Sequence, residues 1–265
     1  MNSQEFRINL DNTYISIIKF GNGPKNFIIL PGLSLTKFEG MGPAIANAYK
    51  LFGNDYTCYL IAPKNLLPQK YSLQEVTEDT YRAMKELGIN KADYFGASMG
   101  GMLCMQMAIS HPEIVNKISL GSTTPLLDEK SSKVFDCWLS LAKEENIAKL
   151  FNIFCEKVYS EEYNRKYADA IAYIATTVTH ENVVHFITLA NAIVEFNIFD
   201  ELPKIKCPVQ YLGSKADKVF SGEIVEKLLK SKLALDSYLY DGYGHAVYDE
   251  APDFRHRIIE FFNKA

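Results

Sequence analysis

Short apolar runs alternate with helical patterns along most of the chain, and this alternation limits the possible folds more than any other feature of the sequence. The runs are rich in β-branched and aromatic residues, and several are too short and too apolar to be exposed hairpins. They comprise residues 13–20, 26–30, 57–61, 92–95, 117–120, 209–212 and 237–240. Helical periodicity follows at residues 73–87, 99–110 and 253–262. Strands that alternate with helices of about 10 to 15 residues predict a doubly wound α/β fold with a mostly parallel sheet.

One long segment, residues 127–196, interrupts this alternation. It contains no convincing strand, and its apolar residues recur at the spacing of amphipathic helices. These residues include Phe135, Trp138, Leu139 and Ala142, followed by Leu150, Phe151, Phe154 and Val158. We therefore predict a core domain formed by residues 1–126 and 197–265 and a helical insertion between two of its strands. The aromatic residues of the insertion provide enough surface to wall an apolar pocket, or they simply pack the insertion against the sheet.

The composition limits the partners that the protein can have. Of the 265 residues, 48% are hydrophobic, which is ample for a buried core, and the net charge is −4. This charge leaves no basic face for a nucleic acid or an anionic membrane surface, so a small-molecule substrate is the expected partner. An oligomer is possible, but nothing in the sequence indicates one.

The cysteines and the N-terminal residues indicate a cytoplasmic protein. The chain has 5 cysteines that are scattered and never form a C-x-x-C pair, so neither a disulfide framework nor a zinc site is predicted. We expect free, mostly buried thiols in a reducing compartment. The first residues lack the apolar segment of a signal peptide, and no apolar run is long enough to span a membrane.

Residues 96–100, Gly-Ala-Ser-Met-Gly, join a predicted strand to a predicted helix. They fit the pattern G-x-S-x-G, in which a serine occupies a sharp, strained turn that requires small residues two positions away on either side. Gly96 and Gly100 meet this steric demand, and the turn holds the Ser98 hydroxyl clear of the sheet edge. The stretch lacks the spacing of a Walker-type phosphate loop or a dinucleotide-binding turn. The remaining alternative is a tight turn whose serine caps the helix.

Two later residues provide the partners that a nucleophilic serine needs. A serine hydroxyl becomes an effective nucleophile when a base removes its proton and a third group orients that base. In turns of this type an acid and then a histidine follow the serine along the chain. Asp217 lies in the turn after the strand at 209–212, and His245 lies in a glycine-flanked loop after the strand at 237–240. Both follow the C-terminal ends of strands, where open parallel sheets gather their binding groups.

Other histidines and acids compete for these two positions. The other histidines lack the strand-end position and are His111, His180, His185 and His256. The acid has closer rivals near predicted strands, namely Asp128, Asp236 and Asp241. The position of Asp217 after a strand and before the histidine loop favours it as the acid.

Five stretches of the chain carry a family resemblance. They are I-I-L-P-G-L-S at 28–34, G-A-S-M-G-G at 96–101, S-H-P-E-I-V at 110–115, Y-L-G-S-K-A-D at 211–217 and D-G-Y-G-H-A at 241–246. Over nearly its whole length the chain resembles the α/β-hydrolases. The resemblance implies that Ser98 is the nucleophile, His245 the base and Asp217 the acid that orients it. It also implies that the helical insertion acts as a cap, or lid, over the serine.

An oxyanion hole needs two N–H donors where negative charge develops. The first expected donor is the amide of Met99, the residue after Ser98. The resemblance implies that the second is the amide of Leu33. Here the chain departs from the family's common His-Gly pair, because it has Pro31-Gly32. Proline removes a side chain that usually braces this loop, which weakens the assignment of Leu33, although Leu33 keeps its own N–H.

These residues predict acyl transfer through an acyl-enzyme on Ser98. We expect a carboxylic ester or thioester with a modest, largely apolar acyl group, and no cofactor or metal, because the sequence has no nucleotide loop or metal-ligand cluster. The same three residues could instead open a lactone, cleave a C–C bond or an amide, or transfer the acyl group to an acceptor other than water. A second class of function is a ligand-binding protein without catalysis. The presence of all three residue types favours an enzyme.

Overall fold

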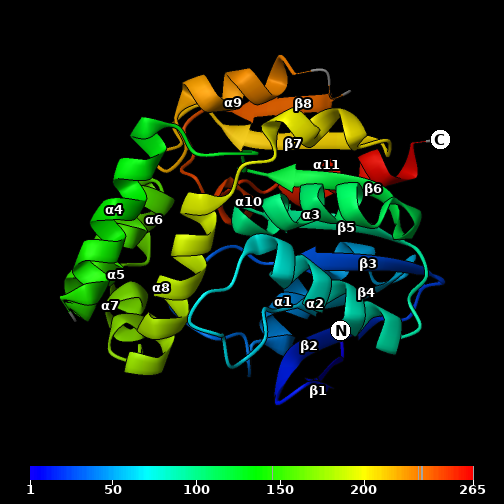
Figure 1. Ribbon diagram of the computed structural model, residues 1–265, viewed down its shortest axis with the longest axis horizontal. Coiled ribbons are helices and arrows are strands. Elements are labelled where there is room, and N and C mark those ends of the chain that lie inside the picture. The colour runs from blue at the N-terminus through cyan, green and yellow to red at the C-terminus, as the bar shows by residue number, and fades with distance from the viewer. Residues whose placement is uncertain (145, 232, 234, 265) are drawn as a thin grey trace.

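The structure, a computed structural model, describes residues 1–144, 146–231, 233 and 235–264. An eight-stranded sheet forms the centre of the molecule (Figure 1). In spatial order its strands are β1 (Ser3–Leu10), β2 (Thr13–Gly21), β4 (Tyr56–Ile61), β3 (Lys25–Leu30), β5 (Ala92–Ala97), β6 (Val115–Gly121), β7 (Val209–Ser214) and β8 (Leu235–Tyr240). Strands β3 to β8 pair in parallel, whereas β2 is antiparallel to β1 and β4. The predicted α/β fold with a mostly parallel sheet is confirmed.

Helices cover both faces of the sheet and divide the core into two apolar layers. Helices α2 (Leu73–Glu86), α3 (Met99–Ser110) and α9 (Gly222–Leu229) pack on one face. Helices α1 (Gly42–Ala48), α10 (Val247–Glu250) and α11 (Phe254–Asn263) pack on the other. In the part of the chain that the structure describes, short 3-10 helices lie in the connections at Lys50–Phe52, Pro112–Ile114 and Phe199–Lys204. Every predicted strand and helix of the core is present, with ends that differ by at most two residues.

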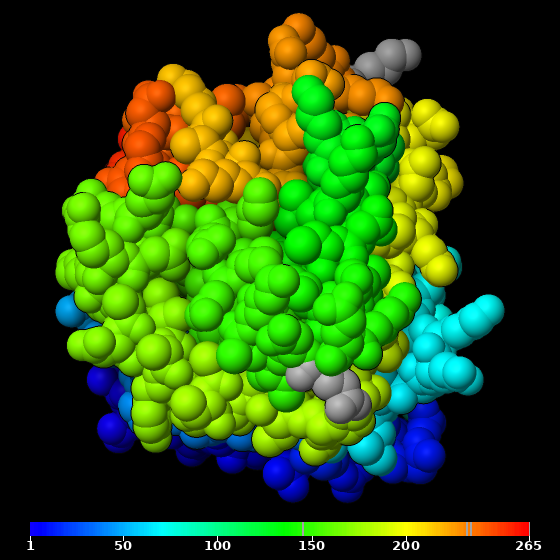
Figure 2. Space-filling model, turned by 90° about the vertical axis from the view of Figure 1, so that its left-hand side faces the viewer, coloured from blue at the N-terminus to red at the C-terminus, as the bar shows by residue number. Residues whose placement is uncertain are grey.

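Among the described residues, five α-helices lie between β6 and β7, over the segment where we predicted a helical insertion. They are α4 (Glu129–Lys143), α5 (Ile147–Val158), α6 (Glu161–Lys166), α7 (Ala168–Ala175) and α8 (His180–Glu195). An isolated antiparallel bridge between Leu126 and Asn197 joins the two ends of the insertion. Figure 2 shows the insertion, coloured green to yellow-green, spread over the middle of one face of the molecule.

Aromatic side chains hold α4, α5 and α8 together inside the insertion. Trp138 packs on Phe154 with ring centroids 4.9 Å apart, and Phe154 packs on Phe186 at 5.9 Å. Phe186 and Trp138 are almost completely buried. The helical periodicity read from the sequence therefore reflects real packing faces, because each of these residues lies on the apolar side of its helix.

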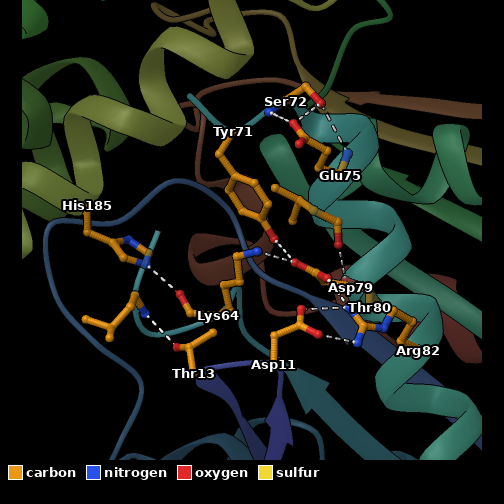
Figure 3. Close-up of polar contacts among 12 residues, drawn as sticks. Asp11, Thr13, Lys64, Tyr71, Ser72, Glu75, Asp79, Thr80, Arg82 and His185 are labelled. Carbon is orange, nitrogen blue, oxygen red and sulfur yellow. Dashed lines mark hydrogen bonds and ion pairs between the residues drawn. The ribbon is translucent and has the colours of Figure 1, made fainter. Parts of the chain in front are cut away.

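A polar cluster under α8 links the insertion to the core (Figure 3). His185 of α8 has its Nε2 atom 3.2 Å from the backbone oxygen of Lys64. The Nζ atom of Lys64 in turn lies 2.8 Å from Oδ2 of Asp79 in α2. Asp79 also accepts a 2.6 Å hydrogen bond from the hydroxyl of Tyr71 and pairs with Arg82. His185 thus contacts the backbone of a loop, and the side chain of Lys64 ties this loop to α2.

The cysteines carry free thiols, and Cys58, Cys104 and Cys155 are buried. Burial raises the pKa of the Cys58 and Cys155 thiols to about 12, so these side chains stay protonated and unreactive near neutral pH. Within the described ranges no helix is both long and apolar enough to cross a lipid bilayer.

Candidate active site

Ser98 lies in the sharp turn between β5 and α3, with φ 53° and ψ −116°. A positive φ is strained for a residue other than glycine, and such strain persists only where the surroundings fix it. The backbone amide of Ser98 donates a 2.8 Å hydrogen bond to the backbone oxygen of Gly121. The backbone oxygen of Ser98 accepts a 2.7 Å hydrogen bond from Thr123 Oγ1. The Ser98 hydroxyl makes no capping hydrogen bond to α3. It is therefore not the helix cap that the alternative interpretation of the turn requires.

The close packing of the turn leaves no room for a side chain at Gly96 or Gly100. A Cβ atom at Gly96 would lie 2.1 Å from the oxygen of Gly100. A Cβ atom at Gly100 would lie 1.9 Å from the oxygen of Leu30 at the end of β3. Both distances are far shorter than a van der Waals contact. The two glycines thus allow the first turn of α3 to approach the neighbouring strand end.

Asp217 and His245 form a buried pair at the ends of β7 and β8. The Oδ2 atom of Asp217 lies 2.8 Å from Nδ1 of His245, and both side chains are nearly inaccessible. The Oδ1 atom accepts hydrogen bonds from the amides of Val219, at 2.7 Å, and Phe220, at 3.0 Å. Because one carboxylate oxygen is held by the backbone, the other faces the imidazole in a fixed direction. This arrangement favours a proton on Nδ1 and leaves Nε2 able to accept one.

The three rival acids are engaged elsewhere. Asp128 accepts a hydrogen bond from the amide of Ser131 at the start of α4, Asp236 pairs with Lys264, and Asp241 pairs with Lys215. Two of the rival histidines are also held away from this place, because His111 contacts Glu78 and His185 contacts the backbone of Lys64. In the described part of the chain, Asp217 is the acid that contacts His245.

A cavity of about 340 Å³ contains both Ser98 and His245 on its wall. The loop after β3 contributes Gly32 and Leu33, and the helical insertion contributes Phe135, Trp138, Phe154, Val158 and Tyr159. A Cβ atom at Gly32 would lie 3.3 Å from the Cβ atom of Ser98, so this loop lies directly against the serine turn. The volume and the mostly apolar wall are typical of sites for small molecules.

The residues of the two expected oxyanion donors, Met99 and Leu33, belong to the serine turn and to the loop beside it. Met99 is the first residue of α3, and a helix leaves the N–H groups of its first turn without partners inside the helix. Leu33 lies in the loop that packs against Ser98 and lines the same cavity. The structure therefore brings both predicted backbone positions to the neighbourhood of the serine.

The insertion is attached directly to the loop that carries His245. The amide of Ala246 donates a 2.8 Å hydrogen bond to the oxygen of Val158 at the end of α5. One carboxylate oxygen of Glu250 accepts hydrogen bonds from the amides of Ser160 and Gly244, at 3.0 and 3.2 Å. The wall of the cavity and the histidine are thus held by one set of contacts, which sequence reasoning did not anticipate.

Sequence reasoning also missed a polar group on the cavity wall. Tyr49, Tyr248, Asp249 and Arg255 line the cavity on the side of α1, α10 and α11. Asp249 is partly exposed, and its Oδ1 atom lies 3.4 Å from Nη2 of Arg255. Burial raises the pKa of Tyr49 to about 12, so its hydroxyl is neutral. The sequence shows Tyr248 and Asp249 three and four residues after His245. It does not show whether their side chains point into the cavity.

No cluster of three or more His, Cys, Asp or Glu side chains suited to a metal ion occurs among the described residues.

Residues 25–252 match the sequence profile of the family described as alpha/beta hydrolase fold. The chain belongs to the α/β-hydrolase fold family. A Rhizobium rhizogenes protein with the provisional name carbamate hydrolase RutD is 23% identical over 201 residues, which cover 74% of this chain and 76% of that protein. The predicted family and the predicted class of enzyme, an α/β-hydrolase, are confirmed.

Two solved structures illustrate the likeness in fold. The α/β-hydrolase enzyme MGS-M2, from a deep-sea metagenome library of the Medee basin, superposes with a TM-score of 0.88 at 17% identity, covering 98% of each chain. The enol-lactonase from Burkholderia xenovorans LB400 superposes with a TM-score of 0.84 at 18% identity, covering 97% of this chain and all of that one. At these identities the likeness establishes the fold of this α/β-hydrolase and leaves its substrate to be argued from the site.

Proposed function

We propose that this α/β-hydrolase is a serine hydrolase that cleaves a carboxylic ester or thioester of a small, largely apolar substrate. The observation that carries the proposal is the buried 2.8 Å contact between Asp217 and His245, because His245 lies on the wall of the same cavity as the strained Ser98. A nucleophile, a base and a group that orients the base are the elements required for acyl transfer at a serine.

The proposed reaction proceeds in two steps. The Oγ atom of Ser98 attacks the carbonyl carbon while Nε2 of His245 takes the hydroxyl proton, and the amides of Met99 and Leu33 stabilise the oxyanion. His245 then gives the proton to the leaving oxygen or sulfur, and the acyl group stays on Ser98. A water molecule, activated by His245, attacks the acyl-enzyme and releases the acid. Asp217 orients the ring of His245 and stabilises the imidazolium that forms in each step.

The insertion, residues 127–196, acts in this proposal as a cap that selects the substrate. Its aromatic and aliphatic side chains form one wall of the cavity, and this wall removes water from the acyl group. The wall supports a preference for an apolar chain next to the attacked carbonyl. The protein is proposed to act on a small molecule, without a cofactor.

A fluorophosphonate probe tests the nucleophile. We expect the probe to label the wild-type protein and to leave Ser98→Ala unlabelled, because the probe reacts only with an activated serine hydroxyl. Ser34→Ala is the matched control, since Ser34 also lines the cavity and its loss should leave labelling intact. Labelling that survives in Ser98→Ala would show that another residue is the nucleophile.

A substrate panel tests the reaction. Esters and thioesters with acyl chains of about 2 to 12 carbons should be hydrolysed, with a clear optimum set by the cavity. The panel should include a lactone and a carbamate, since the relatives above are named for such substrates. If the probe labels Ser98 but only the lactone or the carbamate is cleaved, the ester proposal is wrong and the nucleophile assignment stands.

A further inference from the structure

A charged pair lies on the wall of the cavity that contains Ser98. Asp249 belongs to the short helix α10 and Arg255 to the first turn of α11, and both line this cavity. Most other residues of the wall are apolar, including Ile45, Leu60 and Phe95. Charged side chains are costly beside an apolar cavity unless their hydrogen-bonding groups are satisfied.

The guanidinium of Arg255 is poorly satisfied by the protein. Its Nε atom is buried and has no hydrogen-bond partner among the described residues. Its Nη2 atom reaches Oδ1 of Asp249 at 3.4 Å, a long contact for a charge-assisted hydrogen bond. The group also lies over the ring of Tyr49, 4.7 Å from the ring centre. An arginine has five N–H donors, so this arrangement leaves donors available to a ligand.

The neighbouring acids do not neutralise Arg255 well. The side chain of Asp249 is 39% exposed and its contact with Arg255 is long, so water weakens the attraction between the two charges. Glu250, the next acid along the chain, has a carboxylate oxygen bound to the amides of Ser160 and Gly244. The cavity near Arg255 therefore favours an anion, and the planar fork of a guanidinium matches a carboxylate.

The position of Tyr248 relates this polar region to the serine. The Tyr248 hydroxyl and the Cβ atom of Ser98 both lie close to Gly32. A Cβ atom built on Gly32 would be 3.8 Å from this hydroxyl and 3.3 Å from the Ser98 Cβ atom. Tyr248 directly precedes Asp249 in α10. One cavity thus leads from the serine, past the Tyr248 hydroxyl, to Asp249 and Arg255.

We propose that Arg255 binds a carboxylate at the far end of the acyl group, so that the substrate is a monoester or monothioester of a dicarboxylic acid. The carboxylate forms hydrogen bonds with the free donors of Arg255, while the ester carbonyl lies at Ser98. This inference rests on the proposed function for its reaction. It names a specificity-determining residue that lies outside the three catalytic residues.

Paired esters test this specificity. The 4-nitrophenyl monoesters of adipic, pimelic and suberic acids are compared with the 4-nitrophenyl esters of the monocarboxylic acids of equal carbon number. We expect the wild-type protein to have the higher kcat/KM for at least one carboxylate-tailed ester of the series. In Arg255→Gln, kcat/KM for that ester should fall about 10- to 100-fold, the usual cost of a lost hydrogen bond to a charged group. The neutral esters should change less than about threefold.

Two further variants separate binding from structure. Arg257→Gln is the matched control, because Arg257 lies on the same helix and pairs with Asp253 away from the cavity wall, and both ester series should be unaffected. Asp249→Asn removes the anion that competes for Arg255, so it should maintain or raise the preference for carboxylate-tailed esters. If Arg255→Gln or Asp249→Asn lowers kcat/KM for both series equally, the pair is structural and the proposal is wrong.

Equilibrium binding separates failure of this proposal from failure of the proposed function. Pimelate and heptanoate are titrated into wild-type protein and into Arg255→Gln, and binding is followed by calorimetry. Pimelate should bind the wild type more tightly, and this advantage should disappear in the variant. If no ester is cleaved but the Arg255-dependent binding of pimelate remains, the hydrolase proposal fails and the carboxylate site stands. Equal binding of both acids to the wild type would overturn the carboxylate site.

Discussion

Asp217 contacts His245 through one carboxylate oxygen while the amides of Val219 and Phe220 hold the other. In Asp217→Asn we expect the amide oxygen of the new side chain to keep the two backbone contacts. Its NH₂ group would then face Nδ1 of His245 and force the ring proton onto Nε2. Because Nε2 could no longer accept the serine proton, kcat should fall about 10³- to 10⁴-fold.

The control for this prediction is Asp241→Asn. Asp241 follows β8 and pairs with the exposed Lys215, so its substitution should change kcat less than about threefold. Melting temperatures of both variants check that the fold is intact. A fully active Asp217→Asn with a normal melting temperature would remove Asp217 from the proposed mechanism.

The strand-end residues of the site could be predicted because a steric or topological rule fixes each of them. Ser98 was recognisable from the glycines that its turn requires, and those glycines do lie against backbone oxygens. Asp217 and His245 were recognisable because parallel strands bring their C-terminal ends together. The direction of the Asp217 carboxylate could not be predicted, because it depends on backbone amides in the turn that follows.

Other parts of the fold and site leave little trace in the sequence. Strand β1 was missed because it lies at the edge of the sheet and only Leu10 of its residues is fully buried, so it lacks an apolar run. Helices α1 and α9 were missed because they are only 7 and 8 residues long, too short for a clear period. Arg255 was missed because its place on the cavity wall depends on how α11 packs beside α1 and α10.

Gly100 should tolerate no side chain. The Cβ atom of Gly100→Ala would lie 1.9 Å from the oxygen of Leu30, and the clash involves backbone on both sides. We expect the variant to lose at least about 3 kcal/mol of unfolding free energy, the upper end for overpacking, as measured by urea denaturation. Gly222→Ala is the control, because nothing lies within 4 Å of a Cβ at that helical position, and its stability should be unchanged or slightly higher. Equal stability of the two variants would contradict the packing described for the turn.

Val158 should help to set the acyl-chain length that the cavity accepts. It is buried at the end of α5 and lines the cavity, so the larger side chain of Val158→Phe would fill part of the cavity that contains Ser98. We expect kcat/KM for esters of about 8 to 12 carbons to fall about tenfold relative to esters of 2 to 4 carbons. Labelling by a small fluorophosphonate should persist. Val184→Phe, at an exposed position of α8, should leave the chain-length profile unchanged. A profile that shifts equally in both variants would mean that the cap does not select the chain through this wall.

His185 should make the stability of the protein depend on pH. The imidazole of His185 in α8 is partly buried, 3.2 Å from the backbone oxygen of Lys64, and this burial lowers its pKa below the usual value of 6.5. As the pH falls below about 6.5, the unfolded chain therefore gains a proton that the folded protein resists, and the folded state loses stability. His185→Gln keeps a donor for the Lys64 oxygen but cannot titrate. Urea denaturation at several pH values gives the unfolding free energy of the wild type and of His185→Gln. The difference, wild type minus variant, should decrease from pH 7.5 to pH 5.5. The decrease should be at most about 1.4 kcal/mol per pH unit. A difference that stays constant or grows over this range would mean that His185 is accessible to protons in the folded protein and that its contact beneath α8 is not closed.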